Sequence, residues 1–318
     1  MVPICRLCQG SRMHHFSRRD AKNGEPMSLM LCQACSLVQV TQLPDAVELH
    51  RYYSHEYREN YKLVHAPATK HIVRAAQAAI QRWKWISPHL PAQKSMLVDV
   101  GAGGGEFVYL SQRQGCQSMG LEPHQGYSEF ARQAYEVDVQ TGGVDQLNEA
   151  CADVITLFHV LEHLRDPLQV VQQLHRALRP DGLLAIEVPN ILQADASPHN
   201  IFFSAHLYYY NALSLDLLLS THFEKIWCQH DGNLCVIYRR RSEVKTITMP
   251  TPDAASKALN TFHSRGWWTY LTEGKGWSKP WRRYQQKRLE AQYKHLTPRN
   301  ILDRIDHQLK RTDQPQLF

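Results

Sequence analysis

The chain carries the stretch Met96-Leu97-Val98-Asp99-Val100-Gly101-Ala102-Gly103-Gly104-Gly105-Glu106-Phe107, which predicts a buried strand, a glycine turn and a helix in succession. Gly101, Gly103 and Gly105 allow a tight turn and a close approach of a ligand to the backbone, because they have no Cβ. The N–H groups at the start of the helix would point at that ligand. Glu122 ends the next predicted strand, where a carboxylate can accept hydrogen bonds from both hydroxyls of a ribose. The pattern therefore predicts a site for a nucleoside-containing cofactor.

The glycine spacing by itself leaves NAD and S-adenosylmethionine open, although G-x-G-x-G is not the G-x-G-x-x-G of a pyrophosphate site. Four segments between Val98 and Asn190 then resemble, in the right order, the motifs of class I S-adenosylmethionine-dependent methyltransferases. They are Val98–Gly105 (motif I), Gly120-Leu121-Glu122-Pro123 (motif II), Asp153–Pro167 (the segment after the fourth strand) and Leu178–Asn190 (the following helix, turn and strand). This resemblance implies S-adenosylmethionine as cofactor. It assigns cofactor binding to Asp99, Gly101, Ala102, Gly103, Gly105, Glu122, Pro123, His159 and Val160.

Strand and helix patterns alternate through the core, which predicts an α/β fold with a Rossmann-like, doubly wound parallel sheet. Strands are expected at 96–100, 118–122, 154–158 and 183–188, followed by a hairpin at 225–229 and 234–239. Helices are expected at 106–114, 126–135, 167–178 and 213–220, the last with Ser214 as its N-cap. The carboxyl ends of the parallel strands would then hold the nucleotide.

The cysteines predict a metal site near the N-terminus. Cys5-x-x-Cys8 and Cys32-x-x-Cys35 are separated by 23 residues, and each pair places two thiolates within reach of one ion. Such a set of four cysteines is typical of a structural zinc ribbon, with an iron site or a redox pair as the alternatives. Four protein ligands leave no open position, so the zinc would be structural. His14 and His15 are either spare ligands or surface residues of the ribbon.

Four segments are expected along the chain. Residues 1–42 form the zinc ribbon and 43–92 a helical linker or lid, with one amphipathic helix over 66–85. Residues 93–240 form the methyltransferase core. Residues 241–318 form a short, basic, Trp-rich and mostly helical C-terminal extension that begins with a linker near Pro250, Pro252 and Ser256.

Charge is unevenly distributed over these segments. The whole chain has a net charge of +6, whereas 239–318 hold 17 Lys or Arg against 7 Asp or Glu, which leaves +10 there and −4 elsewhere. A basic extension favours an acidic partner such as a phosphorylated substrate, nucleic acid or an anionic membrane surface. No run of apolar residues is long enough for a membrane span and no secretory leader is evident, so a cytoplasmic location is expected.

Three clusters could supply a proton acceptor for methyl transfer. His163 follows the predicted fourth strand, and Glu162 and His163 are expected to begin the next helix, so His163 could instead cap or pack that helix start. His206 lies in a His-rich loop that resembles the loop of sugar C-methyltransferases acting on nucleotide-linked deoxysugars. That family has a Glu-His pair there with the His as base, whereas this chain has Ala205-His206, and a backbone-bonded core histidine is the alternative.

The third cluster contains Tyr53. The segment Tyr52–Tyr57 is similar to a Tyr-Ser-x-x-Tyr-like segment that folds over the active site in the same sugar enzymes. A lid is the functional interpretation, and aromatic packing between ribbon and core is the alternative.

The sequence therefore favours a methyltransferase that acts on a small-molecule acceptor, with a sugar or nucleotide-sugar as the first choice and a His general base. An RNA or protein methyltransferase that docks through the ribbon and the basic extension is the second choice. A non-catalytic zinc-ribbon scaffold is the third, against which the intact glycine loop and Glu122 argue. The resemblance to sugar enzymes covers 1–240 only.

Overall fold

The computed structural model describes residues 3–45, 48, 67–91, 94–230 and 232–312. The segment Tyr52–Tyr57, with the predicted catalytic Tyr53, lies outside these residues. The chain divides into two compact units, residues 1–49 with 157–280 and residues 50–156 with 281–318. Each unit is built from segments far apart in the sequence, and the four segments predicted above stay a prediction.

The second unit contains the parallel strands that follow from the glycine stretch. β4 (Met96–Val100) pairs with β5 (Gln117–Glu122), and β5 pairs with β6 (Val139–Thr141). Helices α4 (Glu106–Arg113) and α5 (Gln125–Tyr135) connect them, and a short 3-10 helix, η3 (Val144–Gln146), follows β6. The predicted strands and helices are confirmed here within two residues. β6 was not predicted, because only one of its three side chains is buried.

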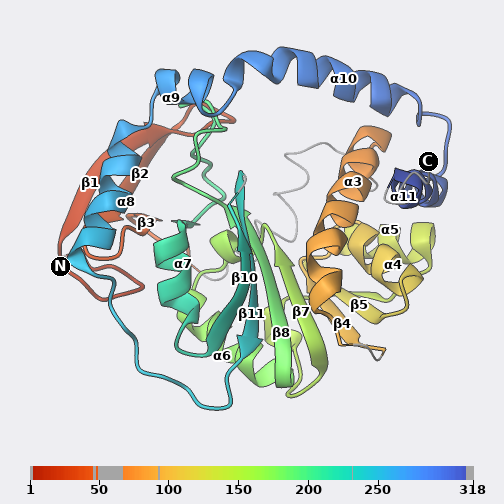
Figure 1. Ribbon diagram of the computed structural model, residues 1–318, viewed down its shortest axis with the longest axis horizontal. Helices are drawn as coiled ribbons and strands as arrows, with labels where there is room; N and C mark the ends of the chain where they lie inside the picture. Colours follow the sequence, from red (N-terminus) through yellow and green to blue (C-terminus); the bar gives the residue numbers. More distant parts are fainter. Residues whose placement is uncertain (1–2, 46–47, 49–66, 92–93, 231, 313–318) are drawn as a thin grey trace, which may run out of the picture. The chain divides into compact units, whose positions relative to one another are not determined.

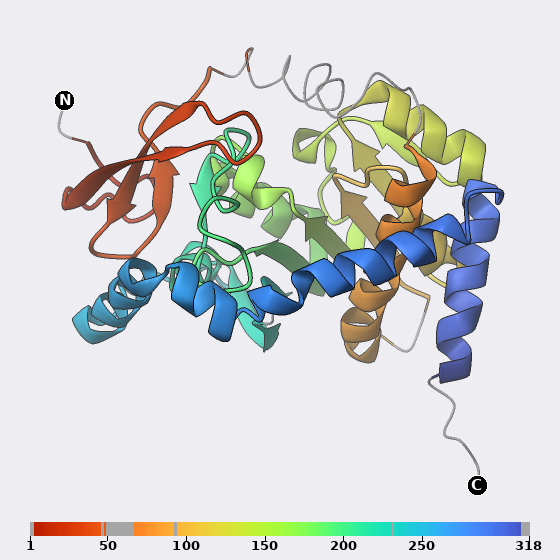
Figure 2. The ribbon, with the colours of Figure 1, turned by 90° about the horizontal axis from the view of Figure 1, so that it is seen from above.

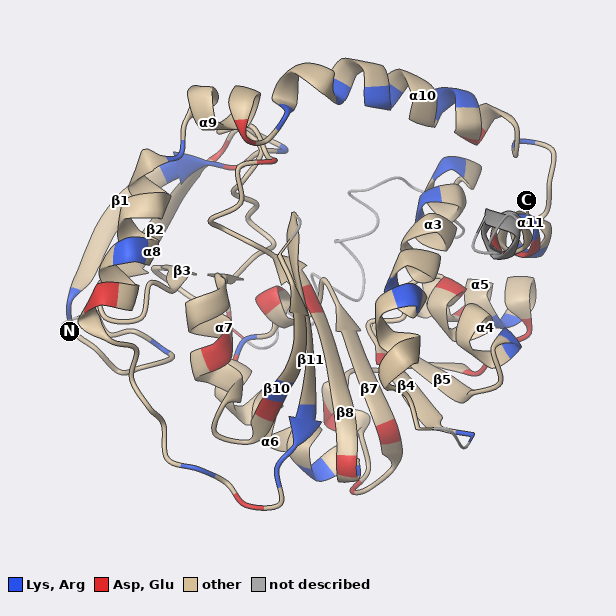
Figure 3. Ribbon diagram, in the orientation of Figure 1, with Lys and Arg blue, Asp and Glu red and all other residues tan. Residues whose placement is uncertain are grey.

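Helix α3 (Thr69–Ile86) confirms the predicted amphipathic helix and buries the expected face, Ile72, Val73, Ala76, Ala79 and Ile80. A 3-10 turn, η2 (Ser87–His89), ends it. Near the C-terminus the chain forms α10 (Lys279–Ala291) and α11 (Pro298–Thr312), so the basic stretch is two helices. Figure 3 shows basic residues spaced along α10. Glu290 of α10 pairs with Arg74 of α3 at 2.6 Å, and Asp303 of α11 accepts a hydrogen bond from Tyr109 of α4 at 2.7 Å.

In the first unit, the N-terminal ribbon is an antiparallel sheet of β1 (Met13–Arg19), β2 (Pro26–Cys32) and β3 (Val38–Val40). β9 (Tyr208–Tyr209) adds a fourth strand to this sheet by pairing with β3. Apolar side chains from both segments share one core: Met27, Leu29, Leu31, Val38, Ile191, Phe202 and Tyr209. The ribbon is therefore packed onto residues 191–209 and does not stand alone.

The same unit holds β8 (Leu178–Pro189), β10 (Phe223–Gln229) and β11 (Asn233–Arg240), which pair antiparallel, β11 with β8 and with β10. The predicted terminal hairpin is thus confirmed. The chain passes from one unit to the other within β7 (Ala152–Phe158), and the hydrogen-bonded strand order is β10-β11-β8-β7-β4-β5-β6. This mixed, Rossmann-like sheet confirms the predicted fold class.

Two predicted details of the helices are wrong. α7 (Ala212–Leu219) is capped by Asn211, whose side chain accepts from the N–H of Ser214, and Ser214 completes the capping box at the third position. Glu162 and His163 lie in a separate 3-10 turn, η4 (Leu161–His163), and do not begin α6 (Pro167–Ala177). α6 starts later because Asp166 caps it and Pro167 fits only its first turn.

The C-terminal extension becomes helical at an earlier residue than predicted. Pro252 and Ser256 lie in α8 (Pro252–Ser264), because Thr251 is its N-cap and proline is well tolerated in a first turn. Phe262 and Leu259 of α8 pack against the ribbon core, and α8 lies alongside β1 and β2 in both views (Figures 1 and 2). α9 (Trp267–Thr272) and the 3-10 turn η5 (Gly276–Ser278) follow. None of the described helices is both long and apolar enough to cross a membrane.

Candidate functional site

The glycine loop after β4 has the backbone geometry that its sequence predicted. Gly101, Gly103 and Gly105 have φ values of 76°, 58° and 85°, in the left-handed region that favours glycine. The N–H groups of Gly101 and Ala102 both donate to the carbonyl of Leu121, at 2.7 and 3.0 Å. The loop is therefore fastened to the end of the neighbouring strand β5.

Gly105 is required for packing. A Cβ on Gly105 would lie 2.7 Å from the Cβ of Ala131 and 3.2 Å from Val137. Gly120 on β5, which belongs to the second predicted motif, is as tightly enclosed, since a Cβ there would lie 2.6 Å from the Cβ of Ala102. Two of the motif glycines thus allow helix, loop and strand to approach closely.

Glu122 is buried, and its carboxylate is held by the backbone. Its Oε2 accepts from the N–H of Gly103 at 2.8 Å, and its Oε1 accepts from the N–H of His124 at 3.1 Å, across the half-buried Pro123. A carboxylate has about four lone-pair positions, so it can accept from several donors at once. Glu122 shapes the loop as well as offering acceptors at the end of β5.

Asp99 faces the interior of the sheet. It is 3% exposed, and its Oδ1 accepts from the hydroxyl of Thr156 on β7 at 2.6 Å. Burial raises the pKa of Asp99 to about 7, although the hydrogen bond from Thr156 acts in the opposite direction. The observed role of Asp99 is to connect two strands under the glycine loop, and its predicted contact with a cofactor stays a prediction.

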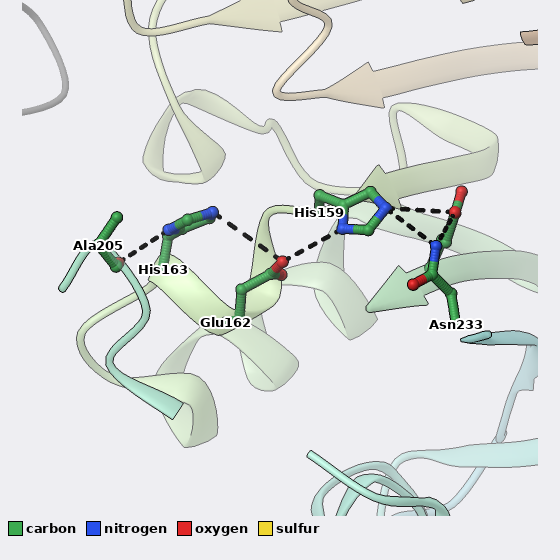
Figure 4. A network of polar contacts seen from close by, with 6 residues as sticks. His159, Glu162, His163, Ala205 and Asn233 are labelled. Atoms are coloured by element: carbon green, nitrogen blue, oxygen red, sulfur yellow. Dashed lines mark hydrogen bonds and ion pairs between the residues drawn. The ribbon is translucent and has the colours of Figure 1, made fainter. Parts of the chain in front are cut away.

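A second group of polar side chains lies in the other unit, around His159 (Figure 4). Its φ is 57°, which is uncommon outside glycine, and its backbone N–H donates to the carbonyl of Glu187 at 2.8 Å. The ring contacts Glu187 Oε1 at 3.2 Å through Nε2 and Glu162 Oε1 at 3.5 Å through Nδ1. Asn233 donates to the same Glu187 oxygen at 2.6 Å. Burial lowers the pKa of His159, but the two carboxylates outweigh it and raise that pKa to about 9.

Glu162 is 1% exposed, and neither carboxylate oxygen receives a hydrogen bond within the described structure. Its nearest cationic groups are the imidazoles of His159 at 3.5 Å and His163 at 3.9 Å. Burial alone would raise the pKa of Glu162, but the attraction of His159 and then His163 lowers it to about 2. Glu162 is therefore an ionised carboxylate in the interior.

His163 and His206 are brought together by the fold. Nδ1 of His163 lies 2.9 Å from the carbonyl oxygen of Ala205, so it must carry the proton, because a carbonyl only accepts. The ring of His206 lies 4.8 Å from that of His163, centroid to centroid, nearly perpendicular to it. Burial, and then the neighbouring His163, lowers the pKa of His206 to about 4, which keeps its ring neutral near pH 7.

The loop that carries His206 is fixed on two sides. The N–H of Leu207 donates to the carbonyl of Glu162 at 2.9 Å, next to the bond between His163 and Ala205. From the ribbon, Asp20 accepts from the N–H of Ser204 at 2.5 Å, and the N–H of Val40 donates to Leu207 at 3.0 Å. Sequence reasoning treated His163 and His206 as separate clusters and did not select Glu162 as a site residue, although it directly precedes His163.

The four predicted metal ligands form one cluster. The Sγ atoms of Cys5, Cys8, Cys32 and Cys35 all lie within 4.8 Å of one another, with Cys5 to Cys35 at 3.6 Å and Cys8 to Cys32 at 3.5 Å. In a tetrahedral zinc site with Zn–S bonds of about 2.3 Å, sulfurs are about 3.8 Å apart, so the set fits zinc. Hydrogen bonds from the neighbouring thiols, Cys35 first, lower the pKa of Cys32. The exposed His14 and His15 lie on β1 and do not belong to this set.

Comparison with known proteins assigns the class of the domain that contains the glycine loop. Residues 68–222 match a family model described as a methyltransferase domain. Over this segment the chain is similar to methyltransferase domains. The segment includes the glycine loop, Glu122, the 3-10 turn with Glu162 and His163, and the loop with His206.

The curated relatives match over parts of their length. The tRNA U34 carboxymethyltransferase of Cellvibrio japonicus is 32% identical over 118 residues, which cover 33% of this chain and 37% of that protein. A probable S-adenosylmethionine-dependent methyltransferase of Mycolicibacterium smegmatis is 30% identical over 131 residues, or 39% of this chain and 50% of the relative. The ubiquinone biosynthesis O-methyltransferase of Vibrio cholerae is 34% identical over 94 residues, or 27% and 38%. This chain thus spans half or less of these relatives.

The solved structures that are similar to this chain include the magnesium protoporphyrin IX methyltransferase of Synechocystis with bound S-adenosylmethionine. It has 14% sequence identity and a TM-score of 0.46, covering 63% of this chain and 99% of that one.

Cofactor binding stays a prediction for Asp99 and for the eight other residues assigned to it, namely Gly101, Ala102, Gly103, Gly105, Glu122, Pro123, His159 and Val160.

Proposed function

We propose that this protein transfers a methyl group from S-adenosylmethionine to a small-molecule acceptor. The observation that carries the proposal is the glycine loop, whose backbone is bonded to the end of β5 through Leu121 and Glu122. This fixed loop lies within the methyltransferase domain, 68–222. The carboxylate of Glu122, at the end of β5 and bonded to the glycine loop, suits the two hydroxyls of a ribose, as the resemblance to class I enzymes implies.

S-adenosylmethionine would supply a methyl group on a cationic sulfur, whose S–C bond breaks as a bond to the acceptor forms. The chain must bind and orient both molecules and remove a proton when the acceptor is a hydroxyl or carbon acid. We assign the proton to His206, with His163 beside it. The neutral ring of His206 can accept a proton. The bond from His163 to the carbonyl of Ala205 fixes the tautomer of His163. Tyr53 stays a prediction for the same step.

A sugar or nucleotide-linked sugar is the proposed acceptor class. The curated relatives include methyltransferases named for small molecules, such as the ubiquinone O-methyltransferases. The extension offers aromatic rings beside basic groups, as where Lys279 Nζ lies 5.0 Å from the ring centre of Tyr270. Such pairs suit stacking on a sugar or base together with attraction of a phosphate.

The ribbon is proposed to bind zinc through Cys5, Cys8, Cys32 and Cys35 and to act structurally. Its structural role follows from its contact with the histidine loop, because β3 pairs with β9, which begins two residues after His206. Loss of the ion would release the strand that fixes the histidine loop. The ribbon thereby supports the proposed catalytic step from outside the domain.

RNA is the second candidate acceptor, because of an unusual set of exposed aromatic side chains. Trp268, Trp277 and Trp281 are 78%, 73% and 63% exposed in a basic stretch of chain. Aromatic rings next to Lys and Arg are the usual means of binding single-stranded nucleic acid. If RNA is bound, Trp277→Ala should weaken binding of an unstructured oligonucleotide by about 1–3 kcal/mol. Binding should also fall steeply with added salt.

The test of the function is a calorimetric titration of zinc-loaded protein with S-adenosylhomocysteine, with NADH as the control ligand. Wild type should bind S-adenosylhomocysteine with micromolar affinity and should not bind NADH. Gly103→Asp places a carboxylate beside Glu122, and Glu122→Ala removes the ribose acceptor, so both should weaken binding at least about tenfold. Wild-type affinity in both folded variants would overturn the cofactor assignment.

A further inference from the structure

Glu162, His163 and His206 form a second group of potential metal ligands, apart from the cysteines. One carboxylate oxygen and one nitrogen from each ring lie within 4.8 Å of one another. These are the two groups of this kind that the described parts of the chain contain. All three residues belong to one compact unit.

If the histidines served only to accept a proton, the burial of the Glu162 carboxylate beside them would have no explanation. It is 1% exposed, and neither oxygen receives a hydrogen bond in the described structure. An interior carboxylate without hydrogen bonds is costly and calls for a compensating partner. His159 approaches one oxygen only to 3.5 Å, which is long for a charged hydrogen bond.

His163 has the arrangement of a metal-bound imidazole. Its Nδ1 donates to the carbonyl of Ala205 at 2.9 Å, so in the neutral ring the lone pair is on Nε2, and Nε2 is the nitrogen 3.9 Å from Glu162. Metal-binding histidines nearly always donate their second N–H to a carbonyl or carboxylate in this way. His206 contributes the third donor from a loop bonded to the ribbon and to η4.

We propose that Glu162, His163 and His206 bind one divalent transition-metal ion. Two imidazoles and a carboxylate suit Zn²⁺, Fe²⁺ or Mn²⁺. With metal–ligand bonds of about 2.0–2.2 Å, the donor atoms would be about 3–3.5 Å apart. His159, between Glu162 and Glu187, then acts as a positioning residue for the carboxylate ligand (Figure 4).

The catalytic meaning of the ion rests on the proposed methyl transfer, whereas its binding does not. Three protein ligands leave open positions for an oxygen of the acceptor, and a bound ion lowers the pKa of such a hydroxyl. With the ion bound, His163 and His206 are ligands, so the proton that was assigned to His206 for the metal-free protein would leave to water instead. The site therefore favours an acceptor with a hydroxyl or two adjacent hydroxyls.

The test uses full-length protein whose cysteine site is already filled with Zn²⁺. Co²⁺ is added as the probe, its visible absorption is followed, and bound Zn²⁺ and Co²⁺ are counted. Wild type should take up one Co²⁺ beyond one Zn²⁺, with the spectrum of nitrogen and oxygen ligands. Glu162→Gln and His206→Asn should each weaken Co²⁺ binding at least about tenfold while the Zn²⁺ content stays unchanged.

A matched control is His222→Asn. The rings of His222 and His175 are 5.2 Å apart and T-shaped, much like those of His163 and His206, but they are not in the ligand group. This variant should bind Co²⁺ as wild type does.

The metal site would be overturned if wild type shows no saturable Co²⁺ binding. It would also be overturned if Glu162→Gln and His206→Asn bind Co²⁺ as tightly as wild type does. If Glu162→Gln does not fold, His206→Asn decides. Titration of the same samples with S-adenosylhomocysteine keeps the two proposals separate. Co²⁺ binding without S-adenosylhomocysteine binding supports the metal site and contradicts the methyl transfer, and the opposite result overturns the metal site alone.

Discussion

Gly120→Ala should both destabilise the protein and weaken cofactor binding. The new Cβ would lie 2.6 Å from the Cβ of Ala102 and 3.1 Å from methyl carbons of Val108 and Val139. Carbon atoms in contact prefer about 3.5–4.0 Å, so Ala102 must move by about 1 Å. Overpacking of this kind costs about 1–3 kcal/mol.

The displaced residue lies in the glycine loop, which links packing to ligand binding. Ala102 and its neighbour Gly101 donate to Leu121, and the N–H of Gly103 donates to Glu122. Weakening one of these bonds costs about 1 kcal/mol. Affinity for S-adenosylhomocysteine should therefore fall about fivefold or more.

Urea unfolding and calorimetry on two single variants and their combination provide the assay. Ala102→Gly removes the atom that the new Cβ meets at 2.6 Å, so the double variant Ala102→Gly/Gly120→Ala should recover about 1 kcal/mol relative to the sum of the single effects. Gly115→Ala is the control. Gly115 has a φ of 100° and no atom near its missing Cβ, so the change should cost about 1 kcal/mol of strain and leave affinity unchanged. Strictly additive effects, or full affinity in Gly120→Ala, would refute the reasoning.

Three further predictions concern the other unit. Cys32→Ser should lower the zinc content, and it should lower the free energy of unfolding by roughly 4 kcal/mol or more. Cys228→Ser, at an exposed position, should change neither quantity. An unaltered metal content in Cys32→Ser would contradict the zinc ribbon. Asn211→Ala should cost about 2 kcal/mol, because this buried cap of α7 also donates to the ribbon, against about 0.5–1 kcal/mol for the exposed cap Thr251→Ala; equal losses in urea unfolding would argue against that link. The raised pKa of His159, about 9, stabilises the fold below about pH 6.5 and this contribution is lost as the pH rises to 9. His159→Asn should flatten the dependence of the free energy of unfolding on pH over this range. The effect should be smaller than the full pKa shift of His159 implies, because the side chain is 38% exposed. An unchanged dependence on pH would refute the raised pKa of His159.

Features that depend on neighbours in the sequence were predictable. The left-handed glycines follow β4 as expected, and the strands and helices of the core begin and end within a few residues of the predicted positions, apart from the N-terminal end of β8. Local hydrophobic period and turn residues are enough for such elements. β6 was not predicted because it is short and only one of its three side chains is buried. The start of α8 was not predicted because Pro252, which is typical of a linker, is here the first helical residue.

Capping and short turns show where local reasoning reached its limit. Ser214 has the residue type of an N-cap, yet Asn211 takes that role because it also donates to Ser36 of the ribbon, 175 residues away in sequence. Likewise, Glu162 and His163 lie in a separate turn, since Asp166 and Pro167 set the start of α6. Of these two, only the contact between Asn211 and Ser36 joins residues that are distant in the sequence.

The sequence by itself predicted the class of the domain, the loop suited to a nucleoside and the four clustered cysteines, because each of these features has a characteristic spacing along the chain. Only the tertiary structure decided that β9 joins the ribbon sheet and that Glu162, His163 and His206 converge. His163 and His206 meet because the ribbon and η4 both bond to the loop from Phe202 to Tyr209. Contacts of this range arise from the packing of whole elements, which no local pattern of residues specifies.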